Sequence, residues 1–310
     1  MTKPFIRPDV QALLEQMNRA GAKRAVDVGL AEARNMMHAS RALLDAPTGD
    51  LAVLRDIAGG PCPMRLFDSR ADRGPGPVMV FFHGGGFVLG DIDTHEPLCA
   101  EIARLMDVPV VSVGYRLAPE HPFPAGVKDA VAAARWVAHS PPELGRQSTS
   151  LVLAGDSAGG NFTIVVALAL RDEPAEVPVL AQWPMYPAAN PTVGYASLAD
   201  FGEGYLLSRD SMHWFDQCYA PDAKDWRYDP LHQSQRGMPP TLVVTASLDP
   251  IRDQGRAYAA ACAQAGVPVV YLEAAGTIHG FLNLRKSLPS AQTDLERCCA
   301  HLRLMLERPQ

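Results

Sequence analysis

The run Gly155-Asp156-Ser157-Ala158-Gly159 is the strongest indication of the fold, because it has the form GxSxG and lies between two apolar segments. The run before it, Ser150–Ala154, has the composition of a buried strand, and Ala158–Arg171 after it has the pattern of a helix. GxSxG at such a junction is typical of a sharp strand-to-helix turn that exposes its serine. The sequence therefore predicts Ser157 as a nucleophile at the end of a buried strand.

A glycine-rich run follows an earlier apolar strand. His83-Gly84-Gly85-Gly86-Phe87 comes directly after Val78–Phe82, and unhindered backbone N–H groups can bind a developing oxyanion. We expect the N–H groups of Gly84, Gly85 and Ala158 to be these donors, and the histidine of the run to anchor the loop. No GxxxxGK[ST] or GxGxxG pattern follows, which argues against a phosphate-binding loop. A nucleophile together with oxyanion donors predicts a serine hydrolase.

A serine hydroxyl is a poor nucleophile and needs a base, which an acid orients. With this kind of elbow the acid follows the nucleophile in the chain and the histidine comes last, each after a strand. Among nine histidines, His279 fits, because it lies just beyond the predicted strand Val267–Leu272. Asp249 follows the predicted strand Thr241–Ala246 and is the expected acid, with Asp253 in the next helix as a minor alternative. Activity should fall on acidification, because the imidazole is a base only when neutral.

Strand-like and helical segments alternate from residue 78 onwards. The expected strands are Val78–Phe82, Val108–Val113, Ser150–Ala154, Val179–Met185, Thr241–Ala246 and Val267–Leu272. The expected helices between and after them are Thr94–Met106, Gly126–His139, Ala158–Arg171, Arg252–Ala265 and Ala291–Leu306. Several strands are apolar on both faces, as in a parallel sheet covered by helices on each side. With Ala52–Ile57 and Met64–Phe67 as antiparallel edge strands, the pattern predicts an α/β fold with a mostly parallel central sheet.

Two regions do not fit this alternation. Residues 1–45 contain two helical stretches, and residues 190–235 are rich in glycine, proline and aromatic side chains. A long aromatic insertion above the carboxyl ends of the strands is where a cap would lie, although the aromatics could instead form only a small core of their own. We therefore expect a catalytic core of residues 46–189 and 236–310 and a helical cap of residues 1–45 and 190–235. The expected substrate-pocket residues are Phe87, Tyr186, Phe201 and Trp214.

Composition limits the possible partners. The 310 residues carry a formal net charge of −6 and are 47% hydrophobic and 20% charged, which is ordinary for a globular protein and argues against nucleic acid. Without an HxH or HExxH motif, we expect no metal and no cofactor. We expect no membrane span, since no apolar run is long enough. Residues Met1–Val10 lack the apolar segment of a signal peptide. The six cysteines should therefore be reduced thiols in a cytoplasmic protein.

Several motifs together resemble a known family. They are the HGGGF run, the sequence YRLAPEHPFPA at Tyr115–Ala125, the elbow within GDSAGGN, the turn Asp249-Pro250 and the sequence His279-Gly280-Phe281. This combination resembles the bacterial hormone-sensitive-lipase-like esterases, over nearly the whole chain from residue 78. The resemblance implies an α/β-hydrolase fold with a helical cap and a small-molecule substrate that is a short- to medium-chain acyl ester.

The resemblance also implies roles for individual residues. The nucleophile, acid and base of the family correspond to Ser157, Asp249 and His279, and its oxyanion loop to Gly84 and Gly85. Family members that act as plant hormone receptors lack the histidine, which is intact here, so an enzyme is favoured over a binding protein. An amide hydrolase like the arylacetamide deacetylases needs the same triad and stays open. A homodimer paired through the strand near Val267–Leu272 is a further possibility.

Overall fold

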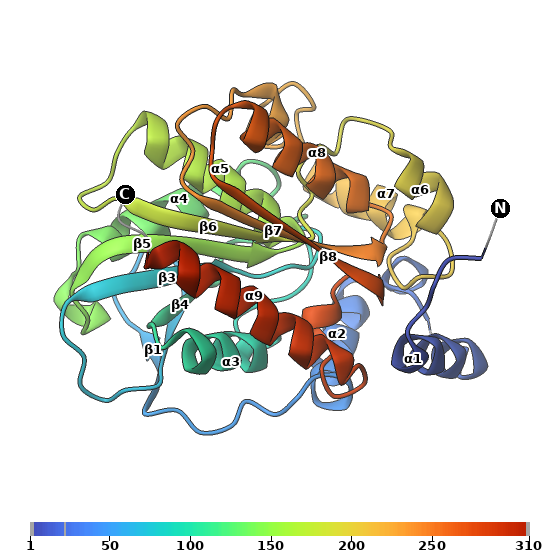
Figure 1. Ribbon diagram of the computed structural model, residues 1–310. Coiled ribbons are helices and arrows are strands. Elements are labelled where there is room, and N and C mark those ends of the chain that lie inside the picture. The colour runs from blue at the N-terminus through green and yellow to red at the C-terminus, as the bar shows by residue number, and fades with distance from the viewer. Residues whose placement is uncertain (1–2, 22, 308–310) are drawn as a thin grey trace.

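Eight strands form one sheet in the order β1-β2-β4-β3-β5-β6-β7-β8 (Figure 1). The computed structural model describes residues 3–21 and 23–307. The strands are β1 (Val53–Ile57), β2 (Met64–Asp68), β3 (Gly76–Phe82), β4 (Val110–Val113), β5 (Ser148–Asp156), β6 (Val179–Met185), β7 (Thr241–Leu248) and β8 (Val269–Ile278). β3 to β8 pair in parallel, whereas β2 pairs antiparallel with both β1 and β4. The predicted mostly parallel sheet with antiparallel strands at one edge is confirmed.

Helices cover both faces of the sheet (Figure 1). The covering helices are α3 (Glu96–Met106), α4 (Ala125–Ala138), α5 (Ala158–Asp172), α8 (Arg252–Gln264) and α9 (Ser290–Leu306). α3 and α9 pack on one face, and α4, α5 and α8 on the other. Neighbouring residues of a strand point to opposite faces, so Val80 and Phe82 of β3 lie in one apolar cluster and Met79 and Phe81 in the other. Both faces are buried, which explains the nearly continuous apolar runs of the strands.

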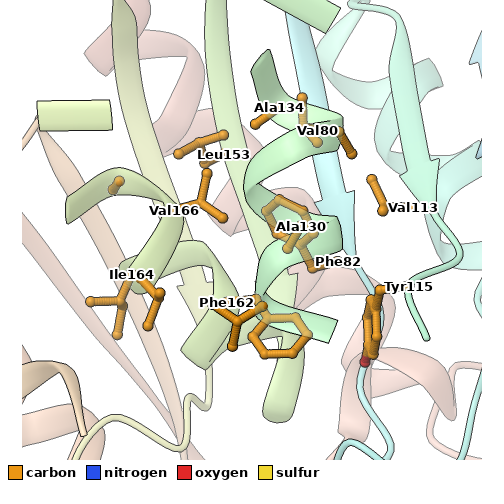
Figure 2. Packing of buried hydrophobic residues seen from close by; sticks show 14 of the residues in the cluster. Val80, Phe82, Val113, Tyr115, Ala130, Ala134, Leu153, Phe162, Ile164 and Val166 are labelled. Atoms are coloured by element: carbon orange, nitrogen blue, oxygen red, sulfur yellow. The ribbon is translucent and has the colours of Figure 1, made fainter. Parts of the chain in front are cut away.

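The cluster behind the nucleophile is closely packed, as Figure 2 shows. Small alanines of α4, among them Ala130 and Ala134, face Val80 and Phe82 of β3. The ring of Phe162 of α5 lies edge-on to that of Phe82, with 6.5 Å between ring centroids. This packing fixes the beginning of α5 against the end of β3, which is where the two predicted functional loops emerge.

The observed strand boundaries differ most at the edge strand. β8 begins two residues later than predicted and continues to Ile278. Its second half contains two alanines and Gly276, which have low strand propensity, but pairing with β7 extends the strand through them. β8 therefore ends immediately before His279. It is an edge of the sheet, as predicted, and the N–H of Arg7 donates to Gly276 O at 2.9 Å beside that edge.

The two segments outside the α/β alternation lie near the ends of β7 and β8 (Figure 1). They contain α1 (Pro8–Arg19), α2 (Leu30–Leu44), α6 (Ala196–Phe201), α7 (Arg209–Tyr219), and the short 3₁₀ helices η1 (Ala25–Asp27) and η3 (Pro230–His232). Arg24 and Asp210, 3.1 Å apart, join the two segments by an ion pair. Residues 1, 2 and 22 of the predicted cap, and 308–310 of the predicted core, lie outside the described residues.

All six cysteines are free thiols, and Cys99, Cys262, Cys298 and Cys299 are buried. Burial raises the pKa of the Cys262 thiol to about 11, which makes it unreactive at neutral pH. Within the described part of the chain, no helix combines the length and the apolar character that crossing a bilayer requires.

Candidate active site

Ser157 lies at the junction between β5 and α5, in a backbone conformation that side chains rarely adopt. Its φ is 55° and its ψ is −115°. The turn is tight because the strand and the helix approach each other closely. A Cβ on Gly159 would lie 1.9 Å from Phe82 O, and one on Gly155 would lie 2.4 Å from Gly159 O. Glycine is therefore required at both positions, as the GxSxG pattern predicts.

His279 lies between Ser157 and Asp249. Its Nε2 is 2.8 Å from Ser157 Oγ, and its Nδ1 is 2.7 Å from Asp249 Oδ2. An ionised carboxylate only accepts hydrogen bonds, so Nδ1 carries a proton and, in the neutral ring, Nε2 accepts from the serine hydroxyl. Asp249 is fully buried, and its Oδ1 accepts the Ile251 N–H at 2.8 Å. The structure thus brings together three side chains that lie far apart in the sequence.

Asp253, the alternative acid, contacts other residues than His279. The carboxylate of Asp253 accepts the Ser197 N–H at 3.0 Å and forms ion pairs with Arg252 and Arg256. These contacts hold the beginning of α8 against α6. The carboxylate that contacts His279 is that of Asp249.

The oxyanion loop differs from the expectation at one position. The Gly84 N–H donates to Asp156 Oδ1 at 2.7 Å, so it is not a free donor, and the prediction for Gly84 is wrong in this respect. Among residues 3–21 and 23–307, no acceptor contacts the N–H groups of Gly85 or Gly86, which are half-buried. The Ala158 N–H is the first of α5, and a helix leaves its first N–H groups unpaired. Within the described residues, the N–H groups of Gly85, Gly86 and Ala158 are therefore available as donors in the glycine-rich run and at the beginning of α5.

The histidine of the glycine-rich run supports the loop. His83 is buried, and burial, together with the nearby His95, lowers its pKa to about 4. The ring is therefore neutral at neutral pH, and its Nδ1–H donates to Gly84 O at 2.8 Å. Tyr115 stacks on the ring with 4.2 Å between centroids, and its hydroxyl donates to His83 O at 2.6 Å. These contacts match the expected anchoring role.

Three of the four expected pocket residues, Phe87, Tyr186 and Phe201, are buried, and Trp214 is half-buried. They make different contacts. Tyr186 meets the His279 ring edge-on, with centroids 5.1 Å apart. Phe87 stacks on Tyr219 of α7 at 4.1 Å. Phe201 instead packs beneath Arg252, whose guanidinium carbon is 5.1 Å from the ring centroid, and Trp214 contacts Phe215. Of the four, Tyr186 is the residue in ring contact with the triad.

Phe215 reaches the oxyanion loop although the pocket prediction omitted it. A Cβ on Gly86 would lie 2.3 Å from the Phe215 ring, so this ring covers the loop from α7. The aromatic pair Trp214-Phe215 was visible in the sequence, but the helical phase that turns Phe215 inward was not. Neither of two open surface hollows, of about 590 and 390 Å³, is lined by the triad, although the smaller one borders His83 and Tyr115. The site is therefore located by its side-chain contacts.

Comparison with known proteins agrees with this geometry. A family model described as alpha/beta hydrolase fold matches residues 79–283, which include the glycine-rich run, the elbow and His279. The chain belongs to this family. It is similar to the carboxylesterase NlhH of Mycobacterium tuberculosis, with 34% identity over 99% of this chain and 99% of that protein. It is also 43% identical to the carboxylic ester hydrolase LipN of the same organism over 68% of this chain, and the match spans 58% of LipN.

A solved structure is similar to this chain over nearly its whole length. The ester-hydrolase EH1AB1 from the metagenome of Lake Arreo gives a TM-score of 0.91 and 34% identity, covering 98% of this chain and 100% of that one. These matches confirm the predicted α/β-hydrolase fold and the resemblance to hormone-sensitive-lipase-like esterases. The chain is a carboxylic ester hydrolase. No group of three or more His, Cys, Asp or Glu side chains that could hold a metal ion occurs within the described residues.

Proposed function

We propose that the chain is a serine esterase that hydrolyses short- to medium-chain acyl esters through Ser157, His279 and Asp249. The observation that carries this proposal is the continuous line of contacts from Asp249 through His279 to Ser157, with distances of 2.7 and 2.8 Å. Both distances are within hydrogen-bond range, so His279 can take the proton of Ser157 while Asp249 orients its ring. Residues 1–45 and 190–235 form the cap over this site in our proposal.

In the proposed reaction, Ser157 Oγ attacks the ester carbonyl carbon while His279 Nε2 takes its proton. The N–H groups of Gly85, Gly86 and Ala158 bind the oxygen of the tetrahedral intermediate. The C–O bond to the alcohol breaks, and the alcohol leaves with the proton from His279. Water then attacks the acyl-enzyme, with His279 as base, which releases the acid and restores Ser157. Asp249 holds the reactive tautomer and stabilises the imidazolium.

Aromatic side chains around Ser157 support a preference for small acyl groups. Phe215 covers Gly86, and Tyr186 borders His279, so aromatic rings lie against both the glycine-rich run and the base. A longer acyl chain needs these rings to move. An ester rather than an amide is the proposed substrate, because the named relatives are ester hydrolases.

The test measures hydrolysis of p-nitrophenyl esters from acetate to palmitate by the wild type and by Ser157→Ala. We expect kcat/KM to peak at about four to eight acyl carbons, and the alanine variant to lose turnover while keeping its circular dichroism spectrum, because the nucleophile alone is removed. Wild-type turnover by Ser157→Ala would exclude the mechanism. A maximum at long chains contradicts the substrate class, and faster hydrolysis of matched p-nitroanilides favours an amide hydrolase.

A further inference from the structure

A buried carboxylate next to the nucleophile contacts the two other loops of the site. Asp156, the last residue of β5, is 3% exposed. Its Oδ1 accepts the Gly84 N–H of the oxyanion loop at 2.7 Å. Its Oδ2 accepts the amide N–H of Asn283 at 3.1 Å. The covalent link to Ser157 supplies the third connection.

Asn283 connects this carboxylate to the catalytic histidine. It ends the short helix η4 (Phe281–Asn283), and its N–H donates to Gly280 O at 3.0 Å. His279 and Asn283 therefore belong to one compact turn. The other amide atom, Asn283 Oδ1, is buried without a partner among the described residues. The hydrogen bond from Asn283 to Asp156 thus joins this turn to the elbow, beside the contact between His279 and Ser157.

A buried histidine balances the charge of the carboxylate. His95 Nε2 lies 3.3 Å from Asp156 Oδ1, and its Nδ1 is 3.0 Å from Thr94 Oγ1. Burial opposes charge on both partners, but their attraction outweighs it, so the pKa of Asp156 is lowered and that of His95 is raised. The carboxylate is therefore ionised and accepts the Gly84 N–H more strongly than a neutral group would.

The position of Gly84 has a direct consequence for the proposed oxyanion donors. A Cβ on Gly84 would lie 2.6 Å from Asp156 Oδ2, so the loop backbone rests on the carboxylate. With the Gly84 N–H turned toward Asp156, the next two N–H groups are left without acceptors among the residues described. One carboxylate thus determines where the loop that carries Gly85 and Gly86 lies relative to Ser157.

We propose that Asp156 is a positioning residue that holds the oxyanion loop and the His279 turn in register with Ser157. The inference rests on the proposed function and deepens it. Asp156 itself touches neither the substrate nor the reacting atoms. Its effect reaches the reaction through Gly84 on one side and Asn283 on the other.

The experiment compares Asp156→Ala with Asp156→Asn. Active sites are counted by the p-nitrophenol released on phosphonylation, so that kcat refers to folded enzyme only. Misplaced oxyanion donors weaken transition-state binding, so Asp156→Ala should lower kcat by about 10- to 100-fold with KM nearly unchanged. Asp156→Asn should recover most of kcat, because its Oδ1 still accepts the Gly84 N–H. Its NH2 group can donate to Asn283 Oδ1 once the Asn283 amide has turned over, since that oxygen has no other partner among the described residues.

Asp129→Ala is the matched control. Asp129 is also buried, accepts the backbone N–H of Arg116 at 3.0 Å and pairs with that guanidinium. It contacts none of the triad, so its loss should reduce stability and leave kcat unchanged. A kcat at the wild-type level in Asp156→Ala, with Ser157→Ala inactive, overturns this inference alone. Wild-type turnover by Ser157→Ala overturns the proposed function.

A double-mutant cycle tests the path through Asn283. Asn283→Ala should lower kcat by about three- to tenfold in the wild type, because the His279 turn loses its tie. In the Asp156→Ala background it should cause no further loss, since the partner is already absent. Fully additive losses would show that the two residues act independently, and would refute the proposed path.

Discussion

At the scale of single residues, the site depends on close approaches that tolerate no side chain. Gly159 is the clearest case, because its Cα faces the carbonyl oxygen of Phe82 across the elbow. Neither partner can move easily, since Phe82 is held in the sheet by β4 and β5. The same approach brings the first N–H of α5 near the end of β3. The glycine therefore serves both the fold and the site.

Gly159→Ala should destabilise the protein and reduce activity. The added methyl group would lie 1.9 Å from Phe82 O, so strand and helix must separate, at a cost of about 3 kcal/mol or more. Urea unfolding followed by circular dichroism measures the loss. Gly194→Ala is the control, because a Cβ added there would have no described atom within 4 Å and the φ of Gly194 is not in the left-handed region. Equal stability of the two variants would contradict the steric account.

At the scale of elements, one arginine fastens the N-terminal segment to the catalytic core. Arg34 of α2 pairs with Glu120 at 2.7 Å, donates to Ala118 O at 3.1 Å and donates to Val88 O at 3.1 Å. The hydrogen bond from Arg34 lowers the pKa of Glu120 to about 2. Val88 directly follows the glycine-rich run His83–Phe87, so α2 is connected to the segment that carries this run. Glu120 is the acidic partner in this connection.

Arg34→Met should loosen α2 while leaving the sheet intact. The aliphatic part of the side chain is retained but all of its hydrogen bonds to the core are lost, so α2 should open more often. Hydrogen exchange measured by mass spectrometry should show about tenfold faster exchange at residues 30–44 and no change in β5 or β7. Glu32→Gln, on the exposed side of α2, is the control. Unchanged exchange in Arg34→Met would show that Arg34 does not fasten the helix.

At the scale of the whole molecule, the parallel sheet brings distant residues together at the carboxyl ends of its strands. The glycine-rich run follows β3, Ser157 follows β5, Asp249 follows β7 and His279 follows β8. Buried charged and neutral histidines lie beneath these loops, so the stability of the whole chain should depend on their protonation. The homodimer, the cap and the cytoplasmic location stay predictions.

His83 should make the folded protein sensitive to acid. Its pKa is about 4 when folded, against 6.5 for the free side chain, so the unfolded chain binds the proton more readily. The free energy of unfolding therefore has its full value above pH 6.5. As the pH falls toward 4, His83 lowers it by up to roughly 3 kcal/mol. His95 contributes with the opposite sign, because its pKa is raised.

The test compares His83→Asn with the wild type in urea unfolding at pH 7, 5.5 and 4.5. Asparagine keeps a donor near the position of Nδ1 but does not titrate. The free energy of unfolding should fall less steeply with acid in the variant than in the wild type. Parallel pH profiles for the two proteins would rule out His83 as a cause of acid sensitivity.

Local sequence patterns were enough to predict the order of strands and helices along the chain, the elbow at Ser157 and the places of Asp249 and His279. Each of these follows from local patterns, because a buried strand, a helix or a glycine turn is encoded by residues adjacent in the chain. The parallel sheet then leaves few positions for an acid and a base after the nucleophile. For this reason the three predicted side chains meet in the structure.

Which glycine N–H groups are free, and which aromatic ring covers them, depends on contacts between distant segments and could not be predicted from the sequence. The N–H of Gly84 is taken by Asp156, 72 residues away in the chain, and Phe215 reaches Gly86 from α7. Three consecutive glycines look alike in sequence, and nothing local distinguishes the inward-facing side of α7. Such choices depend on packing between distant segments, which forms only when the whole chain has folded.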